Sequence, residues 1–382
     1  MIPYGRQSIT DADIAAVVDV LRSDWLTQGP MVPRFERAVS AYCGARHAVA
    51  VNSATSALHI ACLALGLGRN DLLWTSPITF VASANCALYC GARVDFVDID
   101  PKTYNLCPTA LERKLEKAER EGRLPKIVVA VHMCGQSCDM AAISALAARY
   151  GFSIIEDASH AVGGQYGSRP VGACDYSDIA VFSFHPVKII TTAEGGMALT
   201  NCDYLADRMS VLRSHGIIRD PALMDRDPDG PWFYEQIDLG FNYRMTDMQA
   251  ALGVSQMTQL DAHVARRHVL AARYDALLAD LPVTTPWRAA DVYSAFHLYV
   301  ILVPAAVRKA AFLALRDAGV GVNVHYIPVH TQPYYRRLGY RSGDFPVAEA
   351  YYSAAISLPL FPAMTEAQQD QVIAALREAL QA

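Results

Sequence analysis

Short apolar runs alternate with helical patterns along most of the chain. Four such runs lie at residues 94–97, 127–132, 153–155 and 179–184. Between them, residues 108–121 and 141–150 repeat apolar side chains with the period of a helix. Alternating strands and helices predict an α/β fold with a mostly parallel sheet and helices on both faces. Ligands of such sheets bind beyond the carboxyl ends of the strands.

The two ends of the chain show different patterns. Residues 11–23 are apolar at helical spacing after Thr10 or Asp11, which predicts a capped amphipathic helix. A long helical pattern at 246–281 contains the expected domain boundary. Beyond it we expect a strand at 295–303, a helix at 305–318 and a strand at 320–325. The predicted domains are a large one, residues 1–250, and a smaller C-terminal α+β one, residues 251–382.

The composition narrows the function classes. Of 382 residues, 52% are hydrophobic and 19% charged, and the formal net charge is -5. An acidic balance disfavours a nucleic-acid surface, since phosphate binding needs clustered Lys and Arg. We see neither a signal peptide nor an apolar span, so we expect no membrane contact and a cytoplasmic location.

The cysteines do not suggest a disulfide framework or a metal site. Nine is an odd number, and the residues are scattered through a long chain, as expected of reduced thiols. The pairs Cys86/Cys90 and Cys134/Cys138 lack the spacing of common zinc sites. We therefore expect no bound metal.

Lys188 lies where a lysine side chain is unusual. It follows the apolar run 179–184 and precedes Ile190. Burial would lower the pKa of its amine and make it a usable nucleophile. The alternative is a strand-end lysine whose long side chain reaches back to solvent.

The segment 52–58 changes from strand to helix through small hydroxyl residues. Backbone N–H groups at such a helix start form a phosphate seat. Simple N-capping by Ser53 or Thr55 would use the same residues. Both interpretations stay open on these residues alone. Residues 218–238 are rich in Asp, Pro and Gly, which is typical of a functional lid or a disordered loop.

Asp157, Lys188 and the hydroxyl-rich helix start together form the set that pyridoxal 5'-phosphate requires. Four segments carry a closer resemblance: Glu156-Asp157-Ala158-Ser159-His160-Ala161, Ser183-Phe184-His185-Pro186-Val187-Lys188, Glu194-Gly195-Gly196 and Gly240-Phe241-Asn242-Tyr243-Arg244-Met245-Thr246-Asp247. With them the chain resembles, over nearly its whole length, the DegT/DnrJ/EryC1/StrS sugar aminotransferases. The resemblance implies the PLP-dependent aspartate-aminotransferase type of fold (fold type I) and a homodimer.

Roles follow from the chemistry and from the resemblance. Lys188 would hold the cofactor covalently and move a proton at the reacting carbon. Asp157 would keep the cofactor's pyridine nitrogen protonated. The resemblance assigns the remaining cofactor contacts: a ring-stacking Phe80, which could otherwise be core; phosphate contacts from Thr55, Ser56, Ser183 and, from the other subunit, Asn242; and His160, where many relatives have Gln. The two sites of the dimer would therefore be shared.

The expected substrates are an amino-acid donor, L-glutamate, and a nucleotide-linked sugar. Segments 1–7, 23–30, 52–59 and 74–83 resemble the pseudaminic-acid branch of the family, which implies a UDP-linked 4-keto-6-deoxy-2-acetamido hexose. By resemblance, the sugar-nucleotide pocket is bordered by Tyr4, Thr27, Gln28, Gly29, His325 and Tyr326.

Three alternatives accompany this reading. One is an aminotransferase for a GDP- or dTDP-linked ketosugar. Another is a sugar dehydratase of the same fold, which Lys188 disfavours because a histidine replaces the lysine in those relatives. The third is a non-catalytic binding protein, which the presence of both Lys188 and Asp157 disfavours.

Overall fold

A seven-stranded sheet forms the centre of the computed structural model, which describes residues 1–381. The order is β1 (His47–Val51), β9 (Gly196–Thr200), β8 (Ile179–Ser183), β5 (Ser153–Asp157), β4 (Ile127–Val131), β2 (Leu72–Thr75), β3 (Arg93–Phe96). The pairs β3–β2, β2–β4, β4–β5 and β5–β8 are parallel, whereas β9 is antiparallel to β8 and to β1. The predicted mostly parallel sheet is confirmed.

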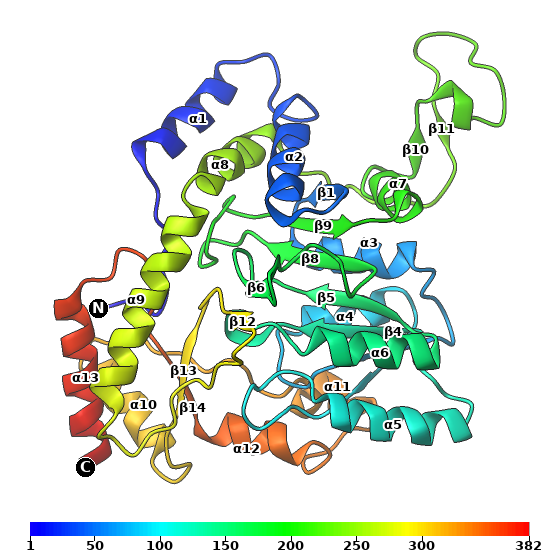
Figure 1. The fold of residues 1–382 in the computed structure, drawn as a ribbon. Coiled ribbons are helices and arrows are strands. Elements are labelled where there is room, and N and C mark those ends of the chain that lie inside the picture. The colour runs from blue at the N-terminus through cyan, green and yellow to red at the C-terminus, as the bar shows by residue number, and fades with distance from the viewer. Residues whose placement is uncertain (382) are drawn as a thin grey trace.

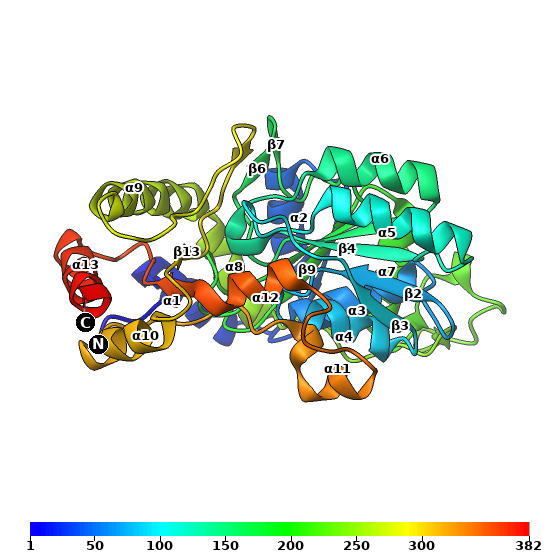
Figure 2. The same cartoon turned by 90° about the horizontal axis from the view of Figure 1, so that it is seen from below.

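Helices cover both faces of the sheet because its central strands are apolar on both faces. All five residues of β4 are buried. Ile127, Val129 and Val131 pack with one set of helices, and the intervening Val128 and Ala130 pack with the other. The first set is α3 (Ala54–Ala64), α4 (Ala82–Tyr89) and α7 (Asp203–Leu212); the second is α5 (Pro108–Arg120) and α6 (Met140–Tyr150). Figure 2 shows α5 and α6 on one side of the sheet and α3 and α4 on the other.

The N-terminal helices lie at the β1 end of the sheet. They are α1 (Asp11–Leu21) and α2 (Met31–Cys43), which pack on α8 (Asp247–Met257). The predicted cap of α1 is confirmed, because Thr10 and Asp13 form a reciprocal capping box. Its apolar Ile14 and Leu21, however, are each 55% exposed.

A second core forms a smaller lobe, left in Figure 1. Its strands are the antiparallel pair β13 (Tyr299–Leu302) and β14 (Ala355–Leu358), and its helices are α9 (Leu260–Leu278), α10 (Arg308–Asp317) and α13 (Glu366–Gln381). Ile2, from the start of the chain, packs into the same core. Two more helices, α11 (Pro333–Arg337) and α12 (Pro346–Ala354), return towards the large sheet. The boundary between residues 250 and 251 stays a prediction.

Two element predictions were wrong. The single helix expected at 246–281 is two helices, α8 and α9, separated at Thr258 and Gln259. The Thr258 hydroxyl donates to the Ser255 carbonyl, and such local bonds compete with a continuing helix. The strand expected at 320–325 forms only isolated bridges, from Val320 to Ile2 and from Asn323 to Ser357. Its alternating apolar residues serve packing rather than sheet pairing.

The segment 218–238 is an arm that projects from the large lobe (Figure 1). A short ribbon closes its base, formed by β10 (Ile217–Ile218) and β11 (Glu235–Gln236). A second small sheet contains β6 (Gln165–Tyr166), β7 (Arg169–Pro170) and β12 (Val292–Tyr293). Gly167, with a φ of 57°, lies in the turn of the β6–β7 hairpin.

Within residues 1–381, no helix has both the length and the apolar character that crossing a bilayer demands. The same residues contain no group of three His, Cys, Asp or Glu side chains able to hold a metal ion. All nine cysteines are free thiols.

Candidate active site

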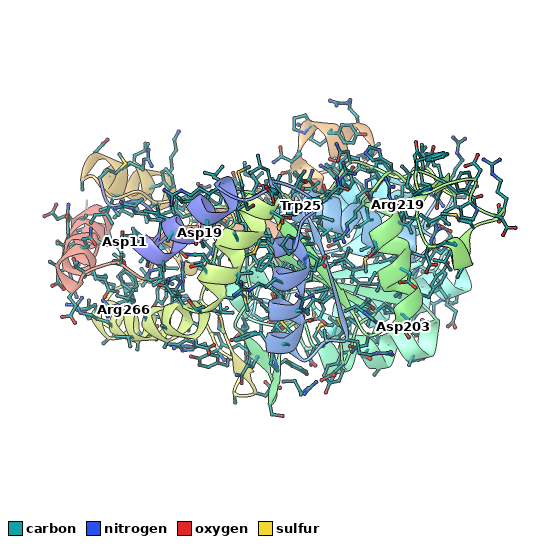
Figure 3. All side chains as sticks on the ribbon, turned by 90° about the horizontal axis from the view of Figure 1, so that it is seen from above. Asp11, Asp19, Trp25, Asp203, Arg219 and Arg266 are labelled. Atoms are coloured by element: carbon teal, nitrogen blue, oxygen red, sulfur yellow. The ribbon has the colours of Figure 1, made fainter. Side chains whose placement is uncertain are left out.

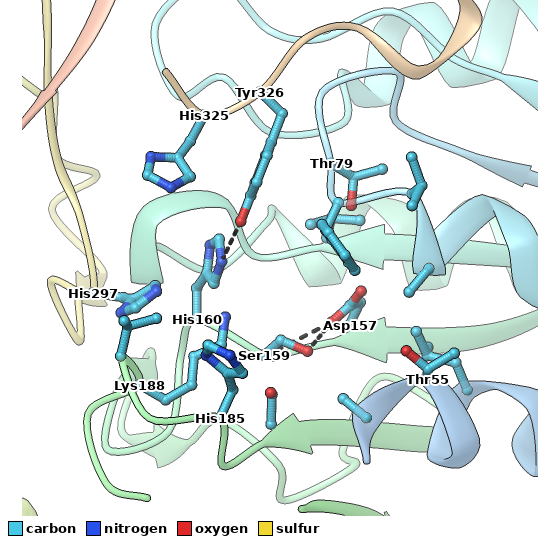
Figure 4. A pocket seen from close by; sticks show the side chains of 18 of the residues that line it. Thr55, Thr79, Asp157, Ser159, His160, His185, Lys188, His297, His325 and Tyr326 are labelled. Atoms are coloured by element: carbon cyan, nitrogen blue, oxygen red, sulfur yellow. Dashed lines mark hydrogen bonds between the residues drawn. The ribbon is translucent and has the colours of Figure 1, made fainter. Parts of the chain in front are cut away.

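A cavity of about 650 Å³ lies beyond the carboxyl ends of β4, β5 and β8. Its position matches the rule for ligand sites of parallel sheets. Nine of the predicted site residues line it: Tyr4, Thr55, Phe80, Asp157, His160, Ser183, Lys188, His325 and Tyr326. Figure 4 shows the side chains that line this cavity, with the strand arrows coming from the right and pointing towards them.

Lys188 reaches the cavity from the turn that follows β8. The turn is anchored because Phe184, Ile189 and Ile190 are buried on either side of it. Lys188 itself is half-buried and lines the cavity. Burial lowers the pKa of its amine to about 8, while the negative charge of Asp157 acts in the opposite direction. The amine is therefore available as a nucleophile near neutral pH.

Asp157 is the last residue of β5 and is 6% exposed. Two hydroxyl groups donate to its carboxylate: Ser83 Oγ to Oδ2 at 2.6 Å and Ser159 Oγ to Oδ1 at 2.6 Å. The Ser159 backbone N–H also donates to Oδ1, at 3.2 Å. Such charge-assisted bonds fix the orientation of the carboxylate.

The start of α3 is brought to the cavity by a close backbone approach. Gly196 pairs with Ser183 across β9 and β8. A Cβ on Gly196 would lie 2.4 Å from both Ala54 N and Ser53 C, so only glycine admits this packing. The approach places Ser183 and Thr55 on one wall with the first N–H groups of α3, which lack acceptors inside the helix.

The start of α3 contains residues that cap the helix and residues that could bind an anion. Ser53 is the N-cap and accepts from Ser56 N. The Ser56 hydroxyl donates to Asn52 Oδ1 at 2.7 Å and lies 3.0 Å from Ser53 Oγ. Ser56 does not line the cavity, whereas Ser53, Ala54 and Thr55 do. The two interpretations of this segment are therefore compatible.

Phe80 and Tyr326 both line the cavity, and their rings are tilted by 57° to each other. Phe80 is 59% exposed, so it is not a core residue. Its ring centroid lies 6.3 Å from that of Tyr326. An exposed aromatic face over a carboxylate-bearing floor suits a flat heteroaromatic ligand.

Histidines form the wall beside Lys188. Tyr326 OH and His160 Nε2 are 3.1 Å apart, and the rings of His160 and His297 are 4.5 Å apart. Burial lowers the pKa of His160 and of His297 well below the usual range, and the positive charge of Lys188 acts in the same direction. Burial also lowers the pKa of His325 to about 4. All three imidazoles are thus neutral near pH 7.

Two atoms of this wall have no partner. The buried Nδ1 atoms of His160 and His297 form no hydrogen bond within the part of the chain that the structure describes. Buried polar atoms of this kind point to a bound group that completes the site. Together with the amine, the carboxylate, the aromatic face and the helix start, they fit the functional groups of pyridoxal phosphate.

Arg267 supports the histidine wall from behind. It lies on α9, is 1% exposed, and burial lowers its pKa to about 10. Its Nη1 donates to the carbonyls of Phe296 (3.1 Å), His297 (3.2 Å) and Leu360 (3.0 Å). The guanidinium therefore fixes the segment that carries His297.

Several residues of the candidate site were not identified from the sequence. His297 stands within an apolar alternating run, and that polar interruption was the available signal. Ser159 lies two residues after Asp157, a spacing typical of local side-chain bonds. Ser83 offered no signal, since it meets Asp157 only through the fold. His185, which the sequence did not assign, lines the cavity.

Besides Ser56, four predicted residues do not line the cavity of their own chain: Thr27, Gln28, Gly29 and Asn242. Thr27 forms a bridge with Thr246, and Gly29 N donates to Asp247 Oδ1 at 3.1 Å, which places residues 27–29 beside α8. Gln28 lies between them with a φ of 56°. Asn242 is exposed and forms a bridge with Ser214. One chain therefore does not bring the whole predicted set together.

Known proteins of similar sequence and structure were found. The model of the DegT/DnrJ/EryC1/StrS aminotransferase family matches residues 7–377. The spore coat polysaccharide biosynthesis protein SpsC of Bacillus subtilis (strain 168) is 41% identical, over 99% of this chain and 96% of that protein.

Solved structures extend the likeness. PseC of Helicobacter pylori, an aminotransferase involved in pseudaminic acid biosynthesis, has a TM-score of 0.90 and 30% identity, covering 100% of this chain and 99% of that one. The putative sugar aminotransferase Spr1654 of Streptococcus pneumoniae, in its PMP form, has a TM-score of 0.91 and 28% identity, covering 100% and 99%. Spr1654 is also known in a PLP form. The match over nearly the whole chain means that this protein belongs to the DegT/DnrJ/EryC1/StrS aminotransferase family and is a PLP-dependent sugar aminotransferase of fold type I.

Proposed function

We propose that the enzyme transfers the amino group of L-glutamate to C4 of a nucleotide-linked 4-keto-6-deoxy sugar, UDP-4-keto-6-deoxy-N-acetyl-β-L-altrosamine. This is the reaction of the UDP-4-amino-4,6-dideoxy-N-acetyl-β-L-altrosamine transaminases. The observation that carries the chemistry is the depressed pKa of Lys188 in a cavity that also contains Asp157. The likeness to PseC over the whole chain supports the sugar.

In the proposed mechanism, Lys188 Nζ has two tasks. As a neutral amine it would hold the cofactor covalently through its aldehyde, and it would then move a proton at the reacting carbon. A pKa of about 8 suits both tasks, because a base works best when its pKa is close to the working pH. Bound pyridoxal phosphate supplies the electron sink for this chemistry.

The other residues bind and orient. Asp157, held by Ser83 and Ser159, would face the pyridine nitrogen and keep it protonated. Phe80 would cover the ring, and Thr55 and Ser183 would hold the phosphate at the start of α3. Ser56, which does not line the cavity, would support this helix start through its bond to Asn52. His160 and Tyr326, which are in contact with each other, would lie beside the ring hydroxyl and the sugar pocket. Tyr4 and His325 complete the sugar side of the cavity.

We further propose a homodimer in which the partner completes each site. Among the described residues that line the cavity, Lys188 is the only lysine or arginine, whereas a sugar nucleotide carries two phosphates. Residues 27–29 and Asn242 would reach the cavity of the partner. An exposed apolar surface on the same chain supports a dimer, formed by Ile14, Leu21, Trp25 and Leu26. Figure 3 shows Trp25 and α1 on one face of the molecule.

The amino-group transfer is tested by spectroscopy. Protein mixed with pyridoxal phosphate should develop an absorption band that L-glutamate bleaches. The Lys188→Ala variant should lose the covalent cofactor band and at least about 100-fold of its activity, because it lacks both the nucleophile and the base. Lys102→Ala removes an exposed lysine elsewhere and should behave like the wild type. A wild-type protein whose band glutamate does not change would disprove transamination from this donor.

The substrate is tested with a panel of UDP-, GDP- and dTDP-linked 4-ketosugars, with mass spectrometry of the aminosugar products. Turnover confined to the UDP sugar is expected. Preferential turnover of a GDP- or dTDP-linked sugar would replace the proposed substrate while leaving the role of Lys188 intact.

A further inference from the structure

Asp247, the first residue of α8, carries a buried carboxylate that does not line the cavity. Its Oδ1 accepts a hydrogen bond from the backbone N–H of Gly29 at 3.1 Å, and its Oδ2 accepts one from the N–H of Met31 at 3.1 Å. These donors lie 218 and 216 residues earlier in the chain. The Asp247 backbone N–H in turn donates to the Leu26 carbonyl at 3.0 Å. The start of α8 therefore fixes the backbone of residues 26–31.

The same carboxylate completes the start of α2. Met31 is the first residue of this helix, and the N-cap residue Pro30 provides no side-chain hydrogen bond. Asp247 supplies the acceptor from α8, so one negative charge lies at the N-termini of two helices. Helix N-termini favour negative charge, which compensates for the burial of the carboxylate.

The backbone at Gly29 is packed tightly against this carboxylate. A Cβ at Gly29 would lie 2.4 Å from Asp247 Oδ2 and 2.5 Å from Trp25 Cβ. Only glycine fits between the two side chains without displacing one of them. The segment is therefore held by packing as well as by hydrogen bonds.

Thr27 and Gln28 present exposed side chains from this fixed backbone. Thr27 forms a bridge with Thr246, the N-cap residue of α8. Gln28 has a φ of 56°, a conformation that costs a non-glycine residue free energy and that is common at binding and catalytic sites. Exposed side chains on a strained, fixed backbone are typical of a preorganised binding element.

The start of α8 also contacts the cavity of its own chain. Gln249 Nε2 donates to the Glu194 carbonyl at 2.9 Å, and Gln249 Oε1 accepts from Thr246 N at 3.0 Å. Glu194 lines the cavity, whereas residues 27–29 do not. Residues 246–249 thus connect the cavity of one chain with a segment that lies outside that cavity.

We propose that Asp247 is a positioning residue for the nucleotide-linked sugar. It holds residues 27–29 in the conformation in which Thr27 and Gln28 contact this substrate in the cavity of the partner subunit. A segment that is already fixed loses little conformational freedom when the substrate binds, so Asp247 increases affinity without touching the substrate. This role rests on the proposed function and on the proposed dimer. In the alternative, Asp247 only stabilises α2 and α8, and its loss would affect both substrates equally.

The first experiment separates the two substrates in the Asp247→Asn variant. Asn has the size of Asp but turns an NH2 group towards one of the two N–H donors, so one contact is lost. Amino-group transfer has two half-reactions, so kcat/KM for L-glutamate reports only the steps before the sugar enters. We expect kcat/KM for the sugar to fall about tenfold because its contacts are misplaced, and kcat/KM for glutamate to stay within about twofold of the wild type. Asp317→Asn, an exposed change on α10, is the matched control.

Gly29→Ala displaces the same segment from the other side and should reproduce the effect on the sugar. The sugar used is the UDP-, GDP- or dTDP-linked 4-ketosugar that the wild type converts fastest. A different nucleotide would then correct the proposed substrate and leave this comparison intact. Equal losses for both substrates in Asp247→Asn, or an unchanged kcat/KM for the sugar, would overturn the positioning role.

The second experiment asks in which chain Asp247 acts. Asp247→Asn and Lys188→Ala subunits are dissociated, mixed in equal amounts and reassociated, and heterodimers are identified by native mass spectrometry. About a quarter of the sites then combine an intact Lys188 with residues 27–29 of an unaltered partner, so kcat/KM for the sugar should rise from about a tenth to about a quarter of the wild-type value. Asp247→Asn mixed with itself is the control.

The two ways in which this second experiment can fail are distinguishable. Heterodimers whose kcat/KM for the sugar stays at or below the Asp247→Asn value would place the action of Asp247 in the cavity of its own chain. A monomeric enzyme would refute the proposed dimer together with this role.

Discussion

Lys188 is surrounded by groups that do not compensate its charge well. Three neutral imidazoles lie near it, and Asp157 is the carboxylate that favours its protonated form. The balance leaves its pKa below the usual value of a lysine, about 10.4. The proton of Lys188 is therefore lost near pH 8 rather than near pH 10.

A pH dependence follows for cofactor capture. The rate at which cofactor-free enzyme binds pyridoxal phosphate covalently should rise with pH and level off above a midpoint near 8, because the neutral amine is the reacting form. Stopped-flow absorbance measures this rate. Asp157→Asn should move the midpoint to lower pH, because the charge that raises the pKa of Lys188 is lost. A midpoint near 10 in the wild type would contradict the depressed pKa.

At this scale the sequence predicted the residues that stand at strand ends. Asp157 and Lys188 could be found because each follows an apolar run that predicts a strand. Ligands of parallel sheets bind beyond the carboxyl ends of such strands, so residues there are candidates for the site. Ser83 and His297 reach the cavity through contacts between segments far apart in the chain, which no local pattern encodes. The close approach of Gly196 to α3 depends on the same long-range packing.

Among the elements, the junction of β9 and α3 is tightly constrained. Gly196→Ala would place a methyl group 2.4 Å from backbone atoms of Ser53 and Ala54, which cannot rotate away. We expect the free energy of unfolding to fall by about 1–3 kcal/mol, the usual cost of overpacking. The displaced helix start should also weaken cofactor affinity. Chemical denaturation and cofactor titration measure the two effects.

Gly68→Ala is the matched control for this substitution. A Cβ at Gly68 has no atom within 4 Å, so its effect on stability should stay within about 0.5 kcal/mol, as for other surface changes. Equal losses in the two variants would show that the close approach at Gly196 does not matter.

The elements themselves differed in how well they could be predicted. The strands of the large sheet were found because their apolar runs are buried on both faces. The break between α8 and α9 was missed because the bond from the Thr258 hydroxyl to the Ser255 carbonyl does not change the spacing of apolar residues in the sequence. Residues 320–325 alternate like a strand, yet their pairing partners offer only single bridges.

At the scale of the whole molecule, the proposed dimer makes a complementation prediction. Lys188→Ala and Asn242→Ala should each be nearly inactive, and their defects should lie in different chains of a shared site. After dissociation and random reassociation of equal amounts, about a quarter of the sites should be intact and activity should return to that level. Mixing two samples of Lys188→Ala is the control. No recovery despite proven exchange of subunits would place Asn242 in the site of its own chain.

The family could be predicted from the sequence because four segments of the chain resemble those of the family. The match to the family model and the similarity to SpsC confirmed this prediction. The sugar could not be predicted in the same way. Its expected contacts at residues 27–29 lie outside the cavity of their own chain. In the proposed dimer they would reach the cavity of the partner, and the pattern of one sequence does not predict how two chains pack.

The buried guanidinium of Arg267 joins the small lobe to the active-site wall that carries His297. Its three acceptor carbonyls belong to the wall that carries His297 and to Leu360 in the core of the small lobe. If the small lobe melted alone, these carbonyls and the charge would lose their partners at the same moment, which is costly in a dry interior. The active-site wall and the small lobe should therefore unfold in a single cooperative step, and heat should abolish catalysis and tertiary structure together.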